Sequence, residues 1–162
     1  MKLSLILTGR NDNYGGHFNE RAILTSKYNF SLLKKNNIDY EVIFVEWNPD
    51  PEKPLFSKVF SQLDDDIQCY VVNSEIHDAI AGKGTAYDYS YMTFYEFFAK
   101  NAAIKRATGD LVLLSNADVF FDEDVFNFLK NYSAEKAPED KFFYRAERCD
   151  LKLNKLADVG DD

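Results

Sequence analysis

The sequence predicts a single α/β domain, built on a mostly parallel, twisted sheet with helices on both faces. Short apolar runs alternate with longer amphipathic segments along most of the chain. The apolar runs are nearly continuous, which is typical of parallel strands that are covered on both faces. The chain has 162 residues, of which 46% are apolar and 15% aromatic, and this suffices for one sizeable core.

The predicted strands and helices alternate along the chain. The run LSLILT ends in the loop GRNDNYGG, and the run YEVIFVE ends in the proline-rich loop WNPDPEKP, so both are predicted to be buried strands. Leu24, Tyr28 and Leu32 recur every four residues and indicate an amphipathic helix. The predicted strands are residues 3–8, 40–46, 67–72, 111–115 and 142–145, and the predicted helices are residues 17–36, 55–63, 93–108 and 122–130.

The connection at residues 73–92 is predicted to be long and irregular. A helix over residues 93–108 is predicted to follow this connection, and Gly109 is predicted to end that helix. The connection carries Tyr87, Tyr89 and Tyr91 in alternation, which suggests an extended piece. Two interpretations remain open for these tyrosines: ordinary packing, which is the simpler one, and a sugar-stacking platform or lid over a site.

The chain is divided into one domain, residues 1–145, and a polar tail, residues 146–162. The apolar run at the N-terminus is too short for a signal peptide, and nothing approaches transmembrane length. We therefore expect no transmembrane segment and a cytoplasmic protein.

Cys69 and Cys149 have no metal-site spacing; a disulfide and two reduced thiols both fit, and reduced thiols are the simpler interpretation. The net charge of -8 disfavours a nucleic acid or an anionic membrane as partner.

Polar residues follow each of the first four predicted strands, where ligands bind in open parallel sheets. The segments are residues 8–12, 46–48, 73–74 and 116–118. Neither G-x-G-x-x-G nor G-x-x-x-x-G-K-[ST] follows a strand, which disfavours a dinucleotide or P-loop site. His17 and His77 follow no strand, and both are interpreted as structural or solvated.

Asp118 places a carboxylate between two apolar segments, where a buried charge is costly unless a partner compensates it. With Asn116 it offers the hard oxygen ligands that Mg²⁺ and Mn²⁺ prefer, and these metals commonly combine one or two carboxylates with substrate phosphates. The alternative is that Asp118 is simply a turn residue.

Residues 98–126, FAKNAAIKRATGDLVLLSNADVFFDEDVF, resemble the nucleotide-sugar half of GT-A glycosyltransferases, especially the inverting family-2 type. The family's pattern is a Lys/Arg-Asn pair, a helix ending in Arg-Ala-x-Gly-Asp/Glu, an apolar strand and an Asp-x-Asp motif. Here Lys100-Asn101, residues 106–110, residues 111–115 and residues 116–118 stand in those places in order. A looser resemblance extends it to about residues 1–130: LILTGRND stands where the family contacts the base, and residues 45–48 where many members have Val-Asp-Asp-Gly.

The resemblance implies a Rossmann-like GT-A domain that takes a nucleotide-diphospho-sugar, with a UDP-linked donor expected and Mn²⁺ or Mg²⁺ as cofactor. The acceptor would be an unidentified glycan, lipid or protein, and transfer would invert the anomeric carbon. The implied site residues are Asp118 for the metal, Asn116 for the ribose or the metal's waters, Thr8, Arg10, Asn11 and Glu46 around base and ribose, and Lys100 or Asn101 against the nucleotide.

Three departures from the family pattern leave alternatives open. Asn116 replaces the first motif aspartate, and Glu-Trp-Asn replaces Asp-Asp-Gly after the second strand. The chain also ends soon after Asp118, where the family continues into its acceptor half, so Glu147 and Asp150 are the late candidates for the general base; both can equally be solvated surface charges. A nucleotide-sugar-binding module without catalysis is therefore the alternative function.

A nucleotidyltransferase is a third possibility. Such enzymes usually have a glycine-rich turn with a basic residue after the first strand, and GRNDNYGG is a poor match to that turn.

Overall fold

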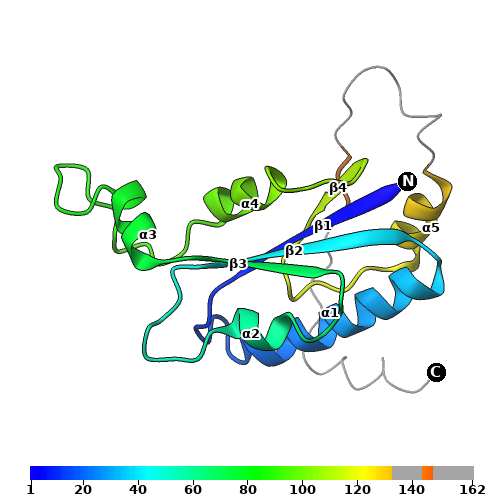
Figure 1. Ribbon diagram of the computed structural model, residues 1–162, viewed down its shortest axis with the longest axis horizontal. Coiled ribbons are helices and arrows are strands. Elements are labelled where there is room, and N and C mark those ends of the chain that lie inside the picture. Colours follow the sequence, from blue (N-terminus) through cyan, green and yellow to red (C-terminus); the bar gives the residue numbers. More distant parts are fainter. Residues whose placement is uncertain (133–143, 148–162) are drawn as a thin grey trace.

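Four strands form one sheet in the computed structural model, which describes residues 1–132 and 144–147. The strands are β1 (Lys2–Gly9), β2 (Asp39–Trp47), β3 (Ile67–Val72) and β4 (Leu111–Leu114). All neighbouring strands are parallel, and the order across the sheet is β3-β2-β1-β4 (Figure 1). The predicted parallel α/β fold class is confirmed, and the bounds of these strands agree with the predicted ones to within one residue.

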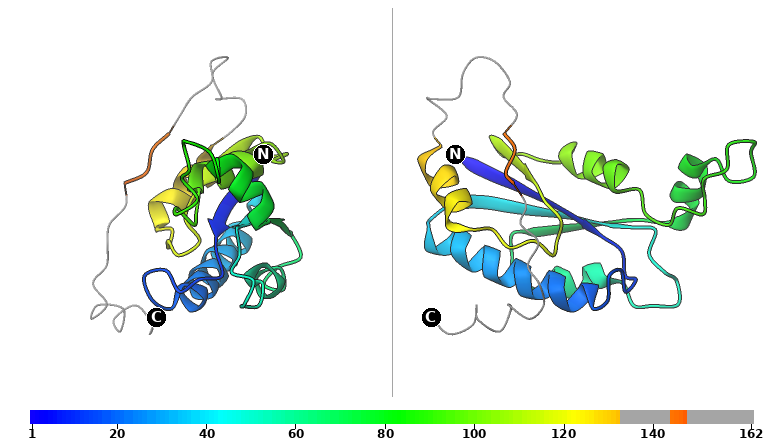
Figure 2. Two further views of the ribbon diagram at one scale, coloured as in Figure 1. Left: turned by 90° about the vertical axis from the view of Figure 1, so that its left-hand side faces the viewer. Right: turned by 180° about the vertical axis from the view of Figure 1, so that it is seen from behind.

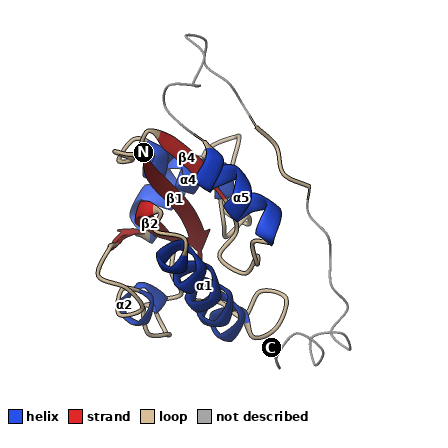
Figure 3. Cartoon of the chain, turned by 90° about the vertical axis from the view of Figure 1, so that its right-hand side faces the viewer, coloured by secondary structure: helices blue, strands red, loops and turns tan. Residues whose placement is uncertain are grey.

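The described residues form helices on both faces of the sheet, as predicted. The helices are α1 (Phe18–Lys35), α2 (Phe56–Phe60), α3 (Ser74–Ala81), α4 (Glu96–Ile104) and α5 (Glu123–Asn131). Helices α1 and α2 cover one face and α4 covers the other, as the views in Figures 1 and 2 show. Helix α5 lies beside α1 and shares its core (Figure 3).

Each face of the sheet packs into its own apolar core, because successive residues of a strand point to opposite sides. Leu3, Leu5 and Leu7 of β1 pack with α1, α2 and α5, whereas Ile6 packs with α4. Strands β1 and β2 are buried over almost their whole length. Because helices cover both faces of the sheet, apolar and polar residues do not alternate along these two strands.

The chain changes direction across the sheet between β1 and β4. It passes from β1 to β2 and β3, and then returns to the other side of β1 to form β4. Helix α1 follows β1 on one face, and α4 precedes β4 on the opposite face (Figure 1). Such a switch point leaves an opening outside the carboxyl ends of the two strands, and ligands bind there in sheets of this class. The fold thus narrows the expected site to the ends of β1 and β4.

The prediction of an irregular connection over residues 73–92 is wrong in its first half, which contains α3. The side chain of Asn73 caps this helix by accepting a hydrogen bond from the backbone N–H of Ile76. Gly82 ends the helix with a left-handed φ of 68°, which glycine adopts without strain. Both end signals are present in the sequence.

The prediction that Gly109 stops the preceding helix is also wrong. Helix α4 is shorter than residues 93–108, and its C-cap is Lys105. Gly109 instead lies against β1, where a Cβ atom would stand 2.7 Å from the carbonyl of Lys2 and from two atoms of Ser4. Glycine is required at this position because the backbone of the connection approaches β1 so closely.

The predicted strand at residues 142–145 is wrong where it can be compared. Tyr144 and Arg145 are described and form no strand, and residues 142–143 lie outside the described residues. The ring of Tyr144 packs on Phe128 of α5, with centroids 5.0 Å apart. The domain boundary at residue 145 stays a prediction. In the described part of the chain, no helix is both long and apolar enough to span a membrane.

Candidate functional site

Two buried polar side chains of α1 form hydrogen bonds that hold the turn after β4 (residues 116–118, the β4 turn) against this helix. The hydroxyl of Thr25 donates to the carbonyl of Ala117 at 2.6 Å, and the amide of Asn29 donates to the carbonyl of Val119 at 2.8 Å. Thr25 and Asn29 are both buried. The backbone on either side of Asp118 is therefore fixed, and the carboxylate has a defined position outside the end of β4.

Asp118 forms an ion pair with Arg21, from the first turns of α1. The Nη2 and Nε atoms of Arg21 lie 3.1 Å and 3.3 Å from the same oxygen, Oδ2. The side chains of Arg21 and Asp118 are 34% and 25% exposed, so the pair lies at the surface of the opening. The guanidinium thus compensates the carboxylate that interrupts the apolar segments.

A second cation reaches the β4 turn from the other face of the sheet. The ammonium of Lys100 on α4 donates to Oδ1 of Asn116 at 3.2 Å and is also paired with Glu96. Arg21 and Lys100 come from helices on opposite faces, so they approach the turn from both sides. Two cations that meet at one strand end can bind a multiply charged anion.

The loop after β1 carries a third cation, Arg10. Its Nε atom donates to the carbonyl of Asn48 at 2.6 Å, and its Nη1 atom lies 2.8 Å from a carboxylate oxygen of Asp12. Its side chain is mostly buried, with 16% exposed. Arg10 therefore links the loops after β1 and β2 and lies at the carboxyl end of the sheet, as predicted.

Three other predicted nucleotide contacts have their side chains in the interior. Both oxygens of Glu46 accept backbone N–H groups at the start of α2, at 2.9 Å each. The amide of Asn11 donates to the carbonyl of Asp50 at 3.0 Å and accepts from its N–H at 2.6 Å. Thr8 is buried in β1. Because Glu46 and Asn11 hold the loop after β2, a nucleotide contact would compete with these bonds.

Lys100 and Asn101, although adjacent, line different places. Asn101 faces a groove of about 400 Å³ between α3 and α4, whereas Lys100 reaches the β4 turn. The groove is lined by Trp47, Val72, Ile76, Ile80, Phe98, Asn101, Ala102, Lys105 and Arg106. The structure thus brings only Lys100 of this pair together with Asn116 and Asp118.

His77 is part of the structure beneath this groove, as the sequence suggested. Its Nδ1 atom accepts a hydrogen bond of 2.9 Å from the indole N–H of Trp47, and its ring stacks on Tyr95. Its Nε2 atom is buried without a hydrogen-bond partner among the described residues. His17 is exposed at the start of α1.

The tyrosines before α4 do not pack against the domain as the simpler interpretation expects. Tyr87, Tyr89 and Tyr91 are exposed, whereas Tyr95 packs on Trp47 and His77. The sugar-platform or lid interpretation therefore stays a prediction for the exposed tyrosines.

Of the two general-base candidates, the structure describes only Glu147, which makes no contact with the β4 turn among the described residues. Glu147 is exposed in the segment 144–147, in which Tyr144 packs on Phe128 of α5. Helix α5 lies toward the amino ends of the strands, away from the β4 turn (Figure 1). Asp150 lies outside the described residues.

Cys69 has no nucleophilic role in this arrangement. Burial within β3, together with the nearby charge of Glu46, raises the pKa of its thiol to about 11. A thiol with this pKa is protonated at neutral pH and reacts slowly.

The donors at the β4 turn fit a metal that is shared with a phosphate ligand. Over residues 1–132 and 144–147, no group of three or more His, Cys, Asp or Glu side chains could hold a metal ion. Asp118 and the amide oxygen of Asn116 supply at most two protein ligands from the turn. Mg²⁺ is usually bound in this way, through one or two carboxylates with phosphates and waters completing the shell.

Sequence reasoning missed Arg21, Thr25 and Asn29, which position or pair the β4 turn. These residues are four apart and therefore lie on one face of α1. A row of polar residues beside the apolar face of a buried helix is the signal that could have found them.

No protein-family model and no curated protein matches the chain. Among solved structures, the chain is similar to the crystal structure of S. aureus TarS, with 19% identity and a TM-score of 0.44. The match covers 80% of this chain and 19% of TarS, so the chain spans about a fifth of that protein's length.

Proposed function

We propose that the chain is a glycosyltransferase that moves a sugar from a UDP-linked nucleotide-diphospho-sugar to an acceptor hydroxyl, with Mn²⁺ or Mg²⁺ held at Asp118. The observation that carries this proposal is the convergence of Arg21, Lys100 and Asp118 at the β1/β4 switch point. Cations from both faces and one fixed carboxylate suit a diphosphate with its metal. The motif resemblance of residues 98–126 supports the donor class and an inverting outcome.

The side chains at the β4 turn have separate roles in this proposal. Cleavage of the bond between sugar and diphosphate leaves negative charge on the departing diphosphate. Lys100 and Arg21 would bind its oxygens from opposite faces of the sheet. A divalent cation on Asp118, with Asn116 beside it, would supply further charge stabilisation to the leaving group. Thr25 and Asn29 fix the backbone on either side of Asp118, so the backbone of the turn needs little reorganisation when the ligand binds.

The second candidate is a nucleotide-sugar-binding module without catalysis. The segment 144–147, which contains Glu147, packs on α5 through Tyr144, away from the β4 turn, and this favours the module because a general base must reach the acceptor hydroxyl. The two candidates share the donor site and differ only in turnover.

Calorimetric titration with UDP tests the shared donor site. With Mn²⁺ present, we expect a chelator to weaken UDP binding by at least about tenfold, and Asp118→Asn to do the same, because the amide removes the charge that holds the metal. Asp124→Asn, an exposed aspartate of α5, is the matched control and should bind UDP as the unmodified chain does. UDP affinity that is indifferent to both the chelator and Asp118→Asn contradicts the proposal.

Turnover separates the two candidates. Incubation with UDP-glucose and other UDP-sugars, Mn²⁺ and a mixture of acceptors should release UDP if the chain is a transferase. Metal-dependent UDP binding without release from any donor would support the binding module.

A further inference from the structure

Arg21 makes contacts that the sequence motif does not explain. Besides its two contacts with Oδ2 of Asp118, its Nη2 atom donates to the carbonyl of Tyr14 at 3.0 Å, and its Nη1 atom to the carbonyl of Gly15 at 3.4 Å. The guanidinium therefore bridges the loop after β1 to the β4 turn. No other described side chain makes these two connections together.

The loop that Arg21 binds has an unusual backbone. Gly15, Gly16 and His17 all have a left-handed φ, of 64°, 75° and 53°. A Cβ atom on Gly15 would stand 3.3 Å from Nη2 of Arg21, so a glycine leaves room for the guanidinium. The loop conformation and the position of Arg21 thus depend on each other.

The same carboxylate oxygen cannot serve Arg21 and a divalent cation at once without strong repulsion between the two positive groups. The ion pair is partly exposed, and exposed pairs are only weakly stabilising, so it can be exchanged for another partner. A diphosphate offers Arg21 such a partner, because the planar guanidinium binds phosphate oxygens in a bidentate manner.

We propose that Arg21 pairs with Asp118 in the ligand-free protein and passes to the diphosphate when the metal takes the carboxylate. This inference rests on the proposed function and adds a consequence to it. Metal and diphosphate bind cooperatively, because the metal must displace Arg21, and the diphosphate gives Arg21 its new partner. The metal alone binds weakly.

Two binding measurements on the full chain test this exchange. Electron paramagnetic resonance of free Mn²⁺ gives the affinity for the metal alone, and calorimetry gives the affinity for UDP at saturating Mn²⁺. For Arg21→Gln we expect Mn²⁺ alone to bind about three- to tenfold more tightly, and UDP with Mn²⁺ to bind about tenfold more weakly. Lys27→Gln removes a charge from an exposed position of the same helix and should change neither affinity by more than about twofold.

Arg21→Lys keeps the charge but loses the planar fork, and it serves as the test if Arg21→Gln does not fold. It should leave the affinity for Mn²⁺ alone close to that of the unmodified chain and weaken UDP binding by less than Arg21→Gln does. The inference is overturned if Arg21→Gln fails to tighten Mn²⁺ binding, fails to weaken UDP binding, or behaves as Lys27→Gln does. These outcomes are distinct from failure of the proposed function, in which Asp118→Asn also leaves UDP binding unchanged.

Discussion

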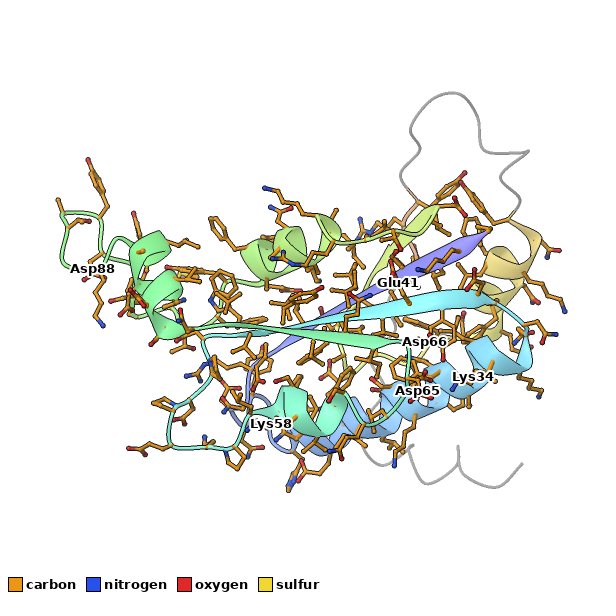
Figure 4. The ribbon with its side chains drawn as sticks, in the orientation of Figure 1. Lys34, Glu41, Lys58, Asp65, Asp66 and Asp88 are labelled. Carbon is orange, nitrogen blue, oxygen red and sulfur yellow. The ribbon has the colours of Figure 1, made fainter. Side chains whose placement is uncertain are left out.

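Two carboxylates at opposite ends of the parallel sheet, Glu41 and Asp118, are held in different ways. At the amino end, Glu41 of β2 accepts hydrogen bonds from Ser4 at 2.6 Å, from the backbone N–H and hydroxyl of Thr108 at 2.7 Å and 2.9 Å, and from Lys2 at 2.9 Å. Figure 4 shows Glu41 within the sheet. At the carboxyl end, Asp118 is partly exposed and forms its ion pair with one side chain, Arg21.

A second buried carboxylate repeats the pattern of the amino end. Asp64 accepts from the hydroxyl of Tyr40 at 2.7 Å and from Lys34 at 2.8 Å; Figure 4 labels Lys34 at this end of α1. Burial alone would raise the pKa of Asp64, but the bonds from Lys34 and Tyr40 lower it below the ordinary value. The charge is therefore stabilised entirely by the fold.

Carboxylates held in these two ways are expected to affect different properties, namely the stability of the fold and the binding of a ligand. A buried carboxylate whose bonds are all internal stabilises the fold, and another ligand can replace those bonds only at high cost. A half-exposed ion pair contributes only about 0–1 kcal/mol to stability, and it can exchange its partner. We therefore expect buried carboxylates such as Glu41 and Asp64 to affect the free energy of unfolding, and Asp118 to affect ligand affinity.

The largest effect on stability is expected from Glu41→Gln. The amide brings N–H groups toward Lys2 and Thr108, which are themselves donors, so the free energy of unfolding should fall by about 2–3 kcal/mol in urea titrations. Glu52→Gln, at an exposed position, should change it by less than about 0.5 kcal/mol. Equal stability of the two variants would remove the distinction between the two ends.

The pH dependence of this loss has a definite sign. Burial would raise the pKa of Glu41, but the bonds from Ser4, Thr108 and Lys2 outweigh it and lower the pKa from 4.5 to about 2. A group whose pKa is lowered by folding adds stability above its unfolded pKa and loses it as the pH falls. The stability gap between the unmodified chain and Glu41→Gln should therefore shrink between pH 4.5 and about pH 2. A gap that stays constant over this range would contradict the assignment.

Gly109→Ala should come next, with a loss of about 1–3 kcal/mol. The new methyl group would collide with backbone atoms of Lys2 and Ser4 and push β4 away from β1. Thermal unfolding followed by circular dichroism measures this effect. Ala102→Gly at the other end of the connection, within α4, gives a control for changed helix propensity alone, at about 1 kcal/mol. A stable Gly109→Ala variant would show that the amino end is less tightly packed than its contacts imply.

A smaller effect is expected at His77, which is buried near the carboxyl end of β2. His77→Phe keeps the stacking on Tyr95 but leaves the indole N–H of Trp47 without its acceptor, at a cost of about 1–2 kcal/mol. His77→Asn retains an acceptor and should keep the Trp47 emission closer to that of the unmodified chain. Trp47 is the single tryptophan of the sequence, so its fluorescence reports this site alone. Identical emission spectra for both variants would argue against the hydrogen bond.

The smallest effect on stability is expected from Asp118→Asn, at less than about 1 kcal/mol. Its partner Arg21 is partly exposed, so the guanidinium can be hydrated when the substitution removes the charge of Asp118. Chemical denaturation without ligands measures this value. A loss comparable to that of Glu41→Gln would mean that Asp118 is primarily a structural residue.

The sequence predicts the strands well because their apolar runs are long and end at clear loop signals. Sequence patterns do not reveal α3, although Asn73 and Gly82 mark both ends, because the glycine and alanine breaks and the clustered tyrosines of residues 73–92 are typical of a loop. The role of Gly109 could not be predicted, because its close approach to Lys2 and Ser4 of β1 joins residues that are far apart in the sequence.

The candidate site is only partly predictable for a related reason. The motif of residues 98–126, which contains both Lys100 and Asp118, is local in sequence, whereas the ion pair of Arg21 with Asp118 joins residues 97 positions apart. The polar residues Glu46 and Asn11 follow strands as binding residues do, but tertiary contacts turn them toward the loop after β2. Strand ends thus give a list of candidates, and the contacts across the sheet decide among them.

A crystal structure of the protein with UDP and Mn²⁺ tests the central claim most directly. We expect Mn²⁺ within about 2.0–2.3 Å of a carboxylate oxygen of Asp118, with the diphosphate beside Lys100 and the guanidinium of Arg21 turned from Asp118 toward it. Nucleotide bound elsewhere, for instance in the groove between α3 and α4, with the Arg21–Asp118 pair intact, would contradict the account.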